Sequence, residues 1–250
     1  MLKQKNNLLR LLLFFLGLLF STSAFSQWVL TSSRIGETSI YAGAGITKLY
    51  GDIGGYAFEK FILNDANTSY AAGFRYTSPY RIGFSVLSEI SNHYQGDDKN
   101  THLDYRQMAF KSKEWGISGQ LEITLLGGTY MSNYNPHTLY TFGGGGYANS
   151  RAQFLDPNLV RPTDKAKNNE VVESFNLFGG FGYQYRLSSR WALGAEYRAT
   201  QFFSDYIDGY HPQFSKRDDM SMDLRVTLAY FFNLNIGGKK IWDCNCDYDK

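Results

Sequence analysis

Polar and apolar residues alternate along most of the chain after residue 36, with a period of two over segments of about ten residues. The last segment is the most regular, because Leu224, Val226 and Leu228 alternate with Asp223, Arg225 and Thr227. A period of two is typical of strands with one apolar and one polar face. Eight segments show the pattern, and we predict a strand for each: 37–49, 69–77, 81–91, 115–125, 138–148, 175–185, 191–200 and 220–232.

The alternation alone does not say which face is the outer one. A soluble barrel or sandwich would turn the apolar face inward and show water a face rich in Lys and Glu. Here the polar face is poor in Lys and rich in Gly, Ser, Thr, Asn and Gln, and aromatic residues stand near the strand ends. Small polar residues fit a narrow lumen, and aromatic strand ends are typical of transmembrane barrels. We therefore predict an all-β fold, a membrane-spanning antiparallel up-and-down β-barrel whose apolar face meets outer-membrane lipid.

The connections between the strands differ in length. Segments 78–80 and 186–190 are predicted to be short turns, and long polar connections are expected at about 50–68, 92–112, 149–173 and 201–218. Bacterial outer-membrane barrels have short periplasmic turns and long outer loops, so both termini are expected in the periplasm. The connection 126–137 is long for such a turn, and a hairpin within it would raise the number of strands from eight to ten.

The first 26 residues predict export. A basic region at 1–10, an apolar block at 11–20 and the small residues Ala24 and Ser26 form the pattern of a secretory signal peptide cleaved after Ser26. An uncleaved anchor is the alternative, but the apolar block is too short to span a bilayer comfortably. The expected organisation is a signal peptide at 1–26, a periplasmic N-terminal segment at 27–36, an outer-membrane barrel at 37–232 and a periplasmic C-terminal tail at 233–250.

Composition excludes several classes of protein. Aromatic residues make up 17% of the 250 residues, with 25 Gly, 5 Pro and 2 Cys, which rules out a collagen, a coiled coil, a disulfide scaffold and a disordered chain. The mean hydropathy of −0.34 and the presence of one long apolar run argue against a helical membrane protein. Without the three bases of the first ten residues, 22 Lys and Arg face 23 Asp and Glu, so the charge implies no nucleic-acid partner.

Charged residues on the polar face are the candidate site. An eight-stranded barrel has room only for side chains, so we expect a plug rather than an open pore. Charges packed in a dry lumen must pair, because an isolated buried charge costs several kcal/mol. We expect a salt-bridged filling with a structural role, and a proton path or ion gate is the alternative. The residues concerned are Arg75, Glu89, Glu122, Glu196, Arg198, Asp223 and Arg225.

Catalytic and cofactor motifs are scarce. The four histidines, His93, His102, His137 and His211, all fall in predicted connections, and neither HExxH nor GxSxG occurs. We expect no enzyme activity, no metal and no cofactor, although outer-membrane barrel enzymes use His, Asp and Ser residues of loops and rims. The run Gly143–Gly146 lacks the Lys-Ser/Thr ending of a phosphate loop and is expected to relieve crowding in a tight barrel.

Cys244 and Cys246 are the only cysteines, and both fall in the predicted tail. A disulfide across one residue is strained, and two lone thiols are a weak signal for a metal. They are either a contact with a periplasmic partner or an incidental pair.

Five longer segments contain the short motifs that distinguish this sequence. They are AGITKLYGDIGG (44–55), AAGFRYTSPYRIGFSVLSEIS (71–91), EWGISGQLEI (114–123), LYTFGGGGYANS (139–150) and FGGFGYQYRLSSRWALGAEYRATQFFSDYIDGYH (178–211). The distinguishing motifs are a predicted strand that runs into Tyr-Gly-Asp, a Tyr-Arg turn, and Ser-Asp-Tyr-Ile-Asp in the last long connection. These segments resemble the PorG-like family of small outer-membrane β-barrels in the Bacteroidetes type IX secretion system. The resemblance covers nearly all of 37–232, and the tail 233–250 departs from a barrel that ends at its terminal aromatic residue.

The resemblance implies an integral outer-membrane component of the type IX protein secretion and gliding motility machinery. Such a component would be non-catalytic and would anchor or assemble a periplasmic ring made of a lipoprotein and its partner. From the residues alone, the alternative is a free-standing small barrel with a structural or adhesive role through its extracellular loops. A barrel that acts on lipid A or cleaves proteins is a third hypothesis.

Overall fold

The computed structural model describes residues 36–53, 67–78, 81–96, 107–127, 136–156, 165–212 and 218–232. The predicted signal peptide 1–26, all but the last residue of the segment 27–36, His102 and the tail 233–250 with Cys244 and Cys246 lie outside these residues. Within the described residues, no helix has the length and apolar character needed to cross a membrane.

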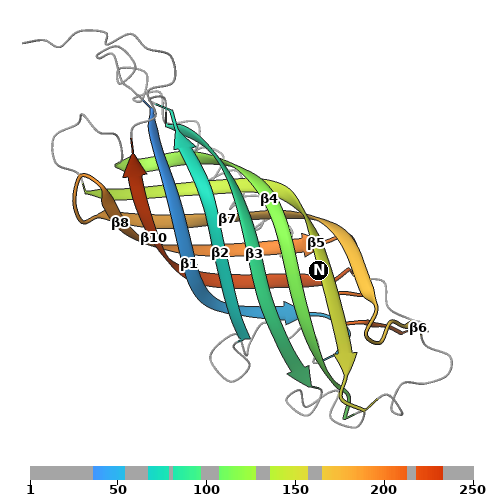
Figure 1. The fold of residues 1–250 in the computed structure, drawn as a ribbon. Helices are drawn as coiled ribbons and strands as arrows, with labels where there is room; N and C mark the ends of the chain where they lie inside the picture. Colours follow the sequence, from blue (N-terminus) through green and yellow to red (C-terminus); the bar gives the residue numbers. More distant parts are fainter. Residues whose placement is uncertain are drawn as a thin grey trace, which may run out of the picture. The chain divides into compact units, whose positions relative to one another are not determined.

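Eight antiparallel strands form one closed barrel in the order β1-β10-β8-β7-β5-β4-β3-β2 (Figure 1). Closure is made by the first and last strands, which pair from Thr38 opposite Phe232 to Tyr50 opposite Met220. The strands are β1 (Glu37–Tyr50), β2 (Asn67–Thr77), β3 (Ile82–Gly96), β4 (Ala109–Gly127), β5 (His137–Phe154), β7 (Val171–Arg186), β8 (Trp191–Phe202) and β10 (Met220–Phe232). The predicted eight-stranded barrel is confirmed. A ten-stranded barrel is wrong, because β4 and β5 pair directly with each other and leave no place for a hairpin between them.

The two ends of the barrel differ. We call the end that carries Glu37, Phe232 and the connections β2–β3, β4–β5 and β7–β8 the turn end. At the β7–β8 turn, the hydroxyl oxygen of Ser188 accepts hydrogen bonds from the backbone N–H groups of Arg190 and Trp191 at 3.3 and 3.2 Å. The opposite end, with the four longer connections, is the loop end. There the two-residue strands β6 (Lys165–Ala166) and β9 (Tyr210–His211) pair with each other.

Exposure follows the predicted faces of the strands. On β10, Leu224, Val226 and Leu228 are 43, 58 and 46% exposed, whereas Arg225 and Thr227 are each 4% exposed. The first three side chains therefore point outward and the last two point into the lumen. A slip of one residue in the register would exchange the two sets, so the pattern fixes the register.

Four strands extend further at the loop end than the sequence predicted. β3 runs to Gly96, β4 begins at Ala109, β5 runs to Phe154 and β7 begins at Val171, so much of the predicted connections 92–112 and 149–173 is strand. The prediction was wrong because most outward residues there are polar, so the contrast between the two faces ends while the backbone ladder continues. These polar outward residues are Asn92, Lys111, Lys113, Asn149, Arg151, Gln153 and Glu173.

Candidate functional site

An apolar band encircles the outer surface of the barrel. On β4 every outward residue from Trp115 to Leu125 is apolar or glycine. At a rise of about 3.3 Å per residue this stretch covers about 33 Å of strand, or about 25 Å across a membrane at a tilt of about 40°. That is the height of the apolar band of transmembrane barrels. Large apolar residues exposed all round a barrel suit lipid rather than water, so the band is the membrane-spanning surface.

Aromatic residues edge this band. At the turn end the rings of Trp191 and Tyr230 lie 4.9 Å apart, edge to face. Toward the loop end the rings of Tyr147 and Phe175 lie 5.7 Å apart. Amphipathic rings at both edges of an apolar band form the girdles of a transmembrane barrel. On β4 the next outward residue beyond Trp115 is Lys113, so the band ends there.

Inside the barrel, Arg75 on β2 is the centre of the charge cluster nearer the turn end. Its Nε donates to Glu122 Oε1 at 2.9 Å, and its Nη2 donates to Glu196 Oε1 at 2.7 Å. The rings of Tyr41 and Tyr140 lie over the guanidinium at 4.5 and 4.9 Å. One base thus joins residues of five strands, and all five residues are buried.

This cluster holds two acids and only one base. Further hydrogen bonds stabilise both carboxylates. Ser85 Oγ and Gln120 Nε2 each donate to Glu122 Oε1 at 2.8 Å. The hydroxyl of Tyr140 donates to Glu196 Oε1. Hydrogen bonds to a charged group are stronger than neutral ones, so these donors offset much of the cost of burying the extra charge.

A second charge cluster surrounds Glu89. Its Oε1 accepts hydrogen bonds from Arg198 Nη1 and Arg225 Nη1. Arg225 Nη2 also lies 3.4 Å from Asp223 Oδ2, and Arg198 stacks over the ring of Phe178 at 3.4 Å. Two bases therefore face two acids, and this cluster is balanced in charge.

All seven residues singled out in the sequence lie in the lumen, and the two clusters contain all of them. Each ion pair except Arg225–Asp223 crosses from one part of the wall to another. Breaking such a buried pair costs about 3–5 kcal/mol, because it leaves one charge without its partner. The arrangement holds the wall together from within.

The placement of His93 in a connection was wrong. His93 lies on β3, is buried in the lumen, and has Nε2 at 3.1 Å from Glu114 Oε2. His137 is the first residue of β5, one residue before the predicted strand, and His211 lies as predicted in the connection between β8 and β10, in its two-residue strand β9. The error for His93 has the cause given above, since β3 continues beyond the point where its outward face turns polar.

Glycines make room for the rings in the lumen. A Cβ at Gly182 would lie 2.3 Å from Cζ of Tyr140, and a Cβ at Gly180 would lie 2.7 Å from Cζ of Phe142. In the run Gly143–Gly146, a Cβ at Gly144 would lie 2.1 Å from the carbonyl oxygen of Gly119. This fits the expected relief of crowding.

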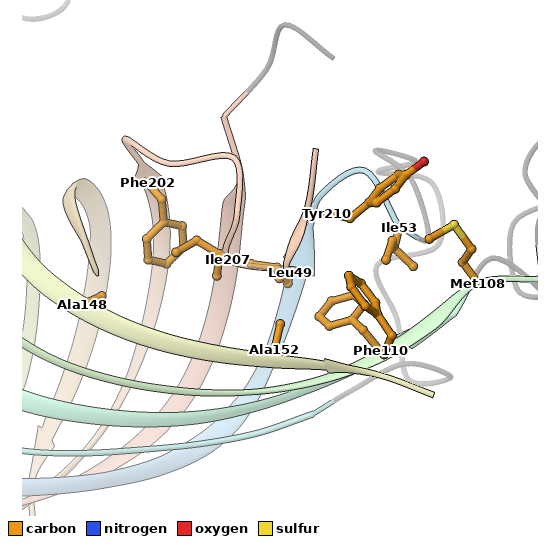
Figure 2. Close-up of a cluster of buried hydrophobic side chains, with 10 residues drawn as sticks. Leu49, Ile53, Met108, Phe110, Ala148, Ala152, Phe202, Ile207 and Tyr210 are labelled. Atoms are coloured by element: carbon orange, nitrogen blue, oxygen red, sulfur yellow. The ribbon is translucent and has the colours of Figure 1, made fainter. Parts of the chain in front are cut away.

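Apolar side chains fill the lumen at the loop end (Figure 2). Leu49, Phe110 and Phe202 point inward from β1, β4 and β8, and Ile53 and Ile207 enter from two connections. We call this cluster, which also contains Met108, Ala148, Ala152, Phe154 and Tyr210, the apolar plug. The carbonyl oxygen of Ile207 accepts hydrogen bonds from Ser112 Oγ at 3.2 Å and Ser150 Oγ at 3.0 Å. The connection between β8 and β10 is therefore bound into the barrel interior.

Carboxylates of the connection between β8 and β10 gather beside the plug, next to the start of the connection between β1 and β2. Asp208 accepts hydrogen bonds from the backbone N–H groups of Ile53 and Tyr210 at 3.1 and 2.8 Å. Asp219 Oδ2 accepts from the N–H groups of Ile207 and Asp208 at 2.7 and 3.3 Å. Burial raises the pKa of Asp208 to about 8 and the pKa of Asp219 well above its ordinary value. His211 Nδ1 pairs with Asp205 Oδ2 in the same region.

Sequence reasoning missed this carboxylate cluster as a site. The signal was present, because Asp52 belongs to Tyr-Gly-Asp and Asp205 and Asp208 belong to Ser-Asp-Tyr-Ile-Asp. Alternation along strands gives no information on how two connections meet. The sequence therefore did not show that the two motifs come together in space.

No protein-family model and no curated protein sequence matches this chain. Solved structures with a similar architecture include Ail, the attachment invasion locus protein of Yersinia pestis, in complex with the heparin analogue sucrose octasulfate. It is 17% identical, with a TM-score of 0.45, over 79% of this chain and 99% of Ail. Neisserial surface protein A is 14% identical, with a TM-score of 0.49, over 80% of this chain and 100% of that protein. OprG of Pseudomonas aeruginosa is 14% identical, with a TM-score of 0.43, over 80% of this chain and 98% of OprG. The fold assignment itself rests on the closed strand register of this chain.

Proposed function

We propose that the protein is a non-catalytic outer-membrane barrel that anchors or assembles a periplasmic complex of the type IX secretion and gliding machinery. The observation that carries this proposal is the filled lumen. Two charge clusters and the apolar plug occupy the described interior from near the turn end to the loop end. A secretion component with such an interior acts through its surface and not as a conduit.

The turn end is the surface that would contact periplasmic partners. Short turns and both chain termini lie on the periplasmic side in bacterial outer-membrane barrels. In the β7–β8 turn, Leu187 is 57% exposed and offers an apolar contact at the tip. Next to it Arg186 pairs with Glu37 at 2.7 Å and lies over the ring of Phe231, which fixes the base of this turn. The turns 78–80, 126–137 and 186–190 and the tail 233–250 complete the proposed surface.

The five segments that resemble the PorG-like family support the assignment to the type IX secretion machinery. The expected partners are therefore the ring lipoprotein and the protein associated with it, with export of this chain by its signal peptide.

Deletion and pull-down experiments test the role. Deleting the protein should block export of type IX cargo, and the tagged barrel should co-purify with the ring components. Leu187→Asp should weaken co-purification and export. The matched control is Leu155→Asp, because Leu155 is 50% exposed at the loop end and the same change there should leave both unchanged. A clean deletion that leaves cargo export and surface motility intact would refute the secretion role.

A free-standing barrel with a structural or adhesive role is the second candidate. The described part of the loop end favours it, because four strands continue beyond the apolar band and β6 pairs with β9 there. In that case the deletion would leave export intact and change the attachment of cells to surfaces, and Leu155→Asp would have the larger effect.

A further inference from the structure

Two connections far apart in the sequence bring three metal-binding groups together at the loop end. Asp52 follows β1, whereas Asp205 and His211 lie in and beside the connection between β8 and β10. Each offers one ligand atom, and the three atoms lie within 4.8 Å of one another. The two segments are held in place by the hydrogen bond from Ile53 N–H to Asp208, which spans 155 residues of sequence.

A second observation points to a cation at this place. Asp219 is 0% exposed, and its Oδ1 has no hydrogen-bond partner. Asp208 Oδ2 and Asp219 Oδ1 converge beside Gly51, since a Cβ there would lie 2.6 and 2.7 Å from them. Gly51 directly precedes Asp52, so the unpartnered oxygen lies beside the chain segment that carries Asp52, and the charge of Asp205 also acts on Asp219.

The negative charge around Asp208 and Asp219 also favours a bound cation. Within the described residues, neither Asp208 nor Asp219 forms an ion pair with Lys or Arg, although both are fully buried. Asp52 and Asp205 add negative potential at Asp208, and Asp205 adds it at Asp219. Buried carboxylates without a basic partner are protonated or neutralised by a bound cation. A proton neutralises one carboxylate, whereas a divalent cation neutralises two.

We propose that Asp52, Asp205 and His211 bind a divalent transition-metal cation of the Zn²⁺ class, whose charge also offsets Asp208 and Asp219. Two carboxylates and one imidazole are zinc ligands, whereas Ca²⁺ and Mg²⁺ take oxygen ligands. Tetrahedral ligands at about 2.1 Å from zinc stand about 3.4 Å apart, so donors that lie up to 4.8 Å apart need to approach by at most about 1.4 Å, and the hydrogen bond between His211 Nδ1 and Asp205 Oδ2 would give way to the metal. Asp52 and His211 are only half-buried, so a cation can reach both side chains from solvent.

A cation here would tie the start of the β1–β2 connection to the β8–β10 connection. Both connections insert an isoleucine into the apolar plug, Ile53 and Ile207. The metal would therefore close the loop end of the barrel. This inference does not depend on the proposed secretion role.

Calorimetric titration of the EDTA-treated, folded full-length mature barrel with ZnCl₂ and CaCl₂ tests the site. One Zn²⁺ should bind per chain, at least about tenfold more tightly than Ca²⁺. Asp52→Asn, Asp205→Asn and His211→Ala should each weaken Zn²⁺ binding by at least about 10–100-fold, the loss that follows when only a hydrogen-bond partner of a metal ligand is removed. Hydrogen exchange in residues 203–212 should slow when Zn²⁺ is added.

Two matched controls keep the test sharp. Asp218→Asn removes an exposed carboxylate from the same connection, and His137→Ala removes a histidine at the turn end. Both variants should bind Zn²⁺ like the unmodified protein. If an aspartate variant does not fold, His211→Ala decides, because its half-exposed side chain is not part of the apolar plug.

Three results would overturn the proposal. The first is the absence of Zn²⁺ binding to the folded barrel at about 100 μM metal, far above the range of structural zinc sites. The second is binding that the three ligand variants leave unchanged, or that His137→Ala abolishes. The third is tighter binding of Ca²⁺ than of Zn²⁺ that survives His211→Ala, which would mean an oxygen-only site.

Discussion

Arg75 and Glu196 form an ion pair of 2.7 Å although their strands, β2 and β8, are three steps apart around the barrel wall. Backbone ladders join only neighbouring strands, so this contact ties parts of the wall that no backbone hydrogen bond connects. Both side chains are almost completely buried. The lumen charges therefore contribute to stability across the barrel rather than along it.

Replacing Arg75 should be costly. Arg75→Met would leave Glu122 and Glu196 buried without a basic partner, so we expect a loss of about 3–5 kcal/mol in the free energy of unfolding. Lys113→Met, at an outward position beyond the apolar band, should change it by at most about 0.5 kcal/mol. Urea unfolding of the barrel folded into lipid vesicles measures both. Adding Glu122→Gln and Glu196→Gln to Arg75→Met should recover part of the loss. Equal losses for Arg75→Met and Lys113→Met would contradict the stabilising role of the Arg75 ion pairs.

A charge placed in the apolar band should also destabilise the barrel. Val226→Arg puts a base on an outward position near the middle of β10, and we expect it to cost about 2–4 kcal/mol. Gln153→Arg puts the same side chain on an outward position beyond the band, where the cost should be about 0–1 kcal/mol. A change at the inward Thr227 should be milder than Val226→Arg. Refolding into bilayers gives the three values, and equal losses would refute the assigned faces.

Neighbouring glycines on β5 should respond in opposite ways to the same change. A Cβ at Gly144 would lie 2.1 Å from the carbonyl oxygen of Gly119, whereas a Cβ at Gly143 would meet only an oxygen at 3.7 Å. Gly144→Ala should therefore cost about 1–3 kcal/mol or more through overpacking. Gly143→Ala should be neutral or stabilising by about 0.4–1 kcal/mol, because alanine restricts the unfolded chain. The urea midpoints of the two variants make the comparison, and a similar loss in both would argue against this register.

The purified barrel should not form a stable channel. The charge clusters and the apolar plug fill the lumen, so planar-bilayer recording should show no ion conductance beyond leak. Steady, large single-channel steps would mean that the plug leaves the lumen in a membrane.

The β8–β10 connection should open more readily as the pH rises in metal-free protein. Asp208 has a pKa of about 8 when the connection is closed and about 4 when it is open, so the closed form binds the proton more tightly. That contribution is complete below about pH 4 and is lost as the pH rises toward about 8. Hydrogen exchange of residues 203–212, corrected for its intrinsic pH dependence, should show this loss between pH 5 and 8. Asp208→Asn should flatten the dependence, while the neighbouring groups Asp52, Asp205, His211 and Asp219 are unchanged between the two proteins. The same slope in both would exclude Asp208 as the cause.

Alternation predicted the strands where the two faces differ in polarity and failed where they do not. Leu224 to Leu228 on β10 shows the successful case, since an apolar lipid face opposes a polar lumen. The extensions around Lys113 and Arg151 show the other case, because water meets the outer face there and the sequence loses its contrast.

The members of the charge clusters were visible in the sequence, but their pairing was not. Arg75, Glu122 and Glu196 all stand at inward positions, yet barrel closure and strand tilt decide which of them meet. The carboxylate cluster of Asp208 and Asp219 depends on how the β8–β10 connection meets the start of the β1–β2 connection, and no periodic pattern encodes that path.

The distribution of charge partners among the strands has a consequence for the order of assembly. Arg75 on β2 finds Glu122 as soon as β4 is in place, but Glu89 on β3 has to wait for Arg198 on β8 and Arg225 on β10. Until those late strands arrive, a partly built wall would present a carboxylate without a basic partner to the membrane interior, which is costly. Insertion of the early hairpins by themselves is therefore unfavourable, and the chain should enter the bilayer only when its last strands are ready to join the first.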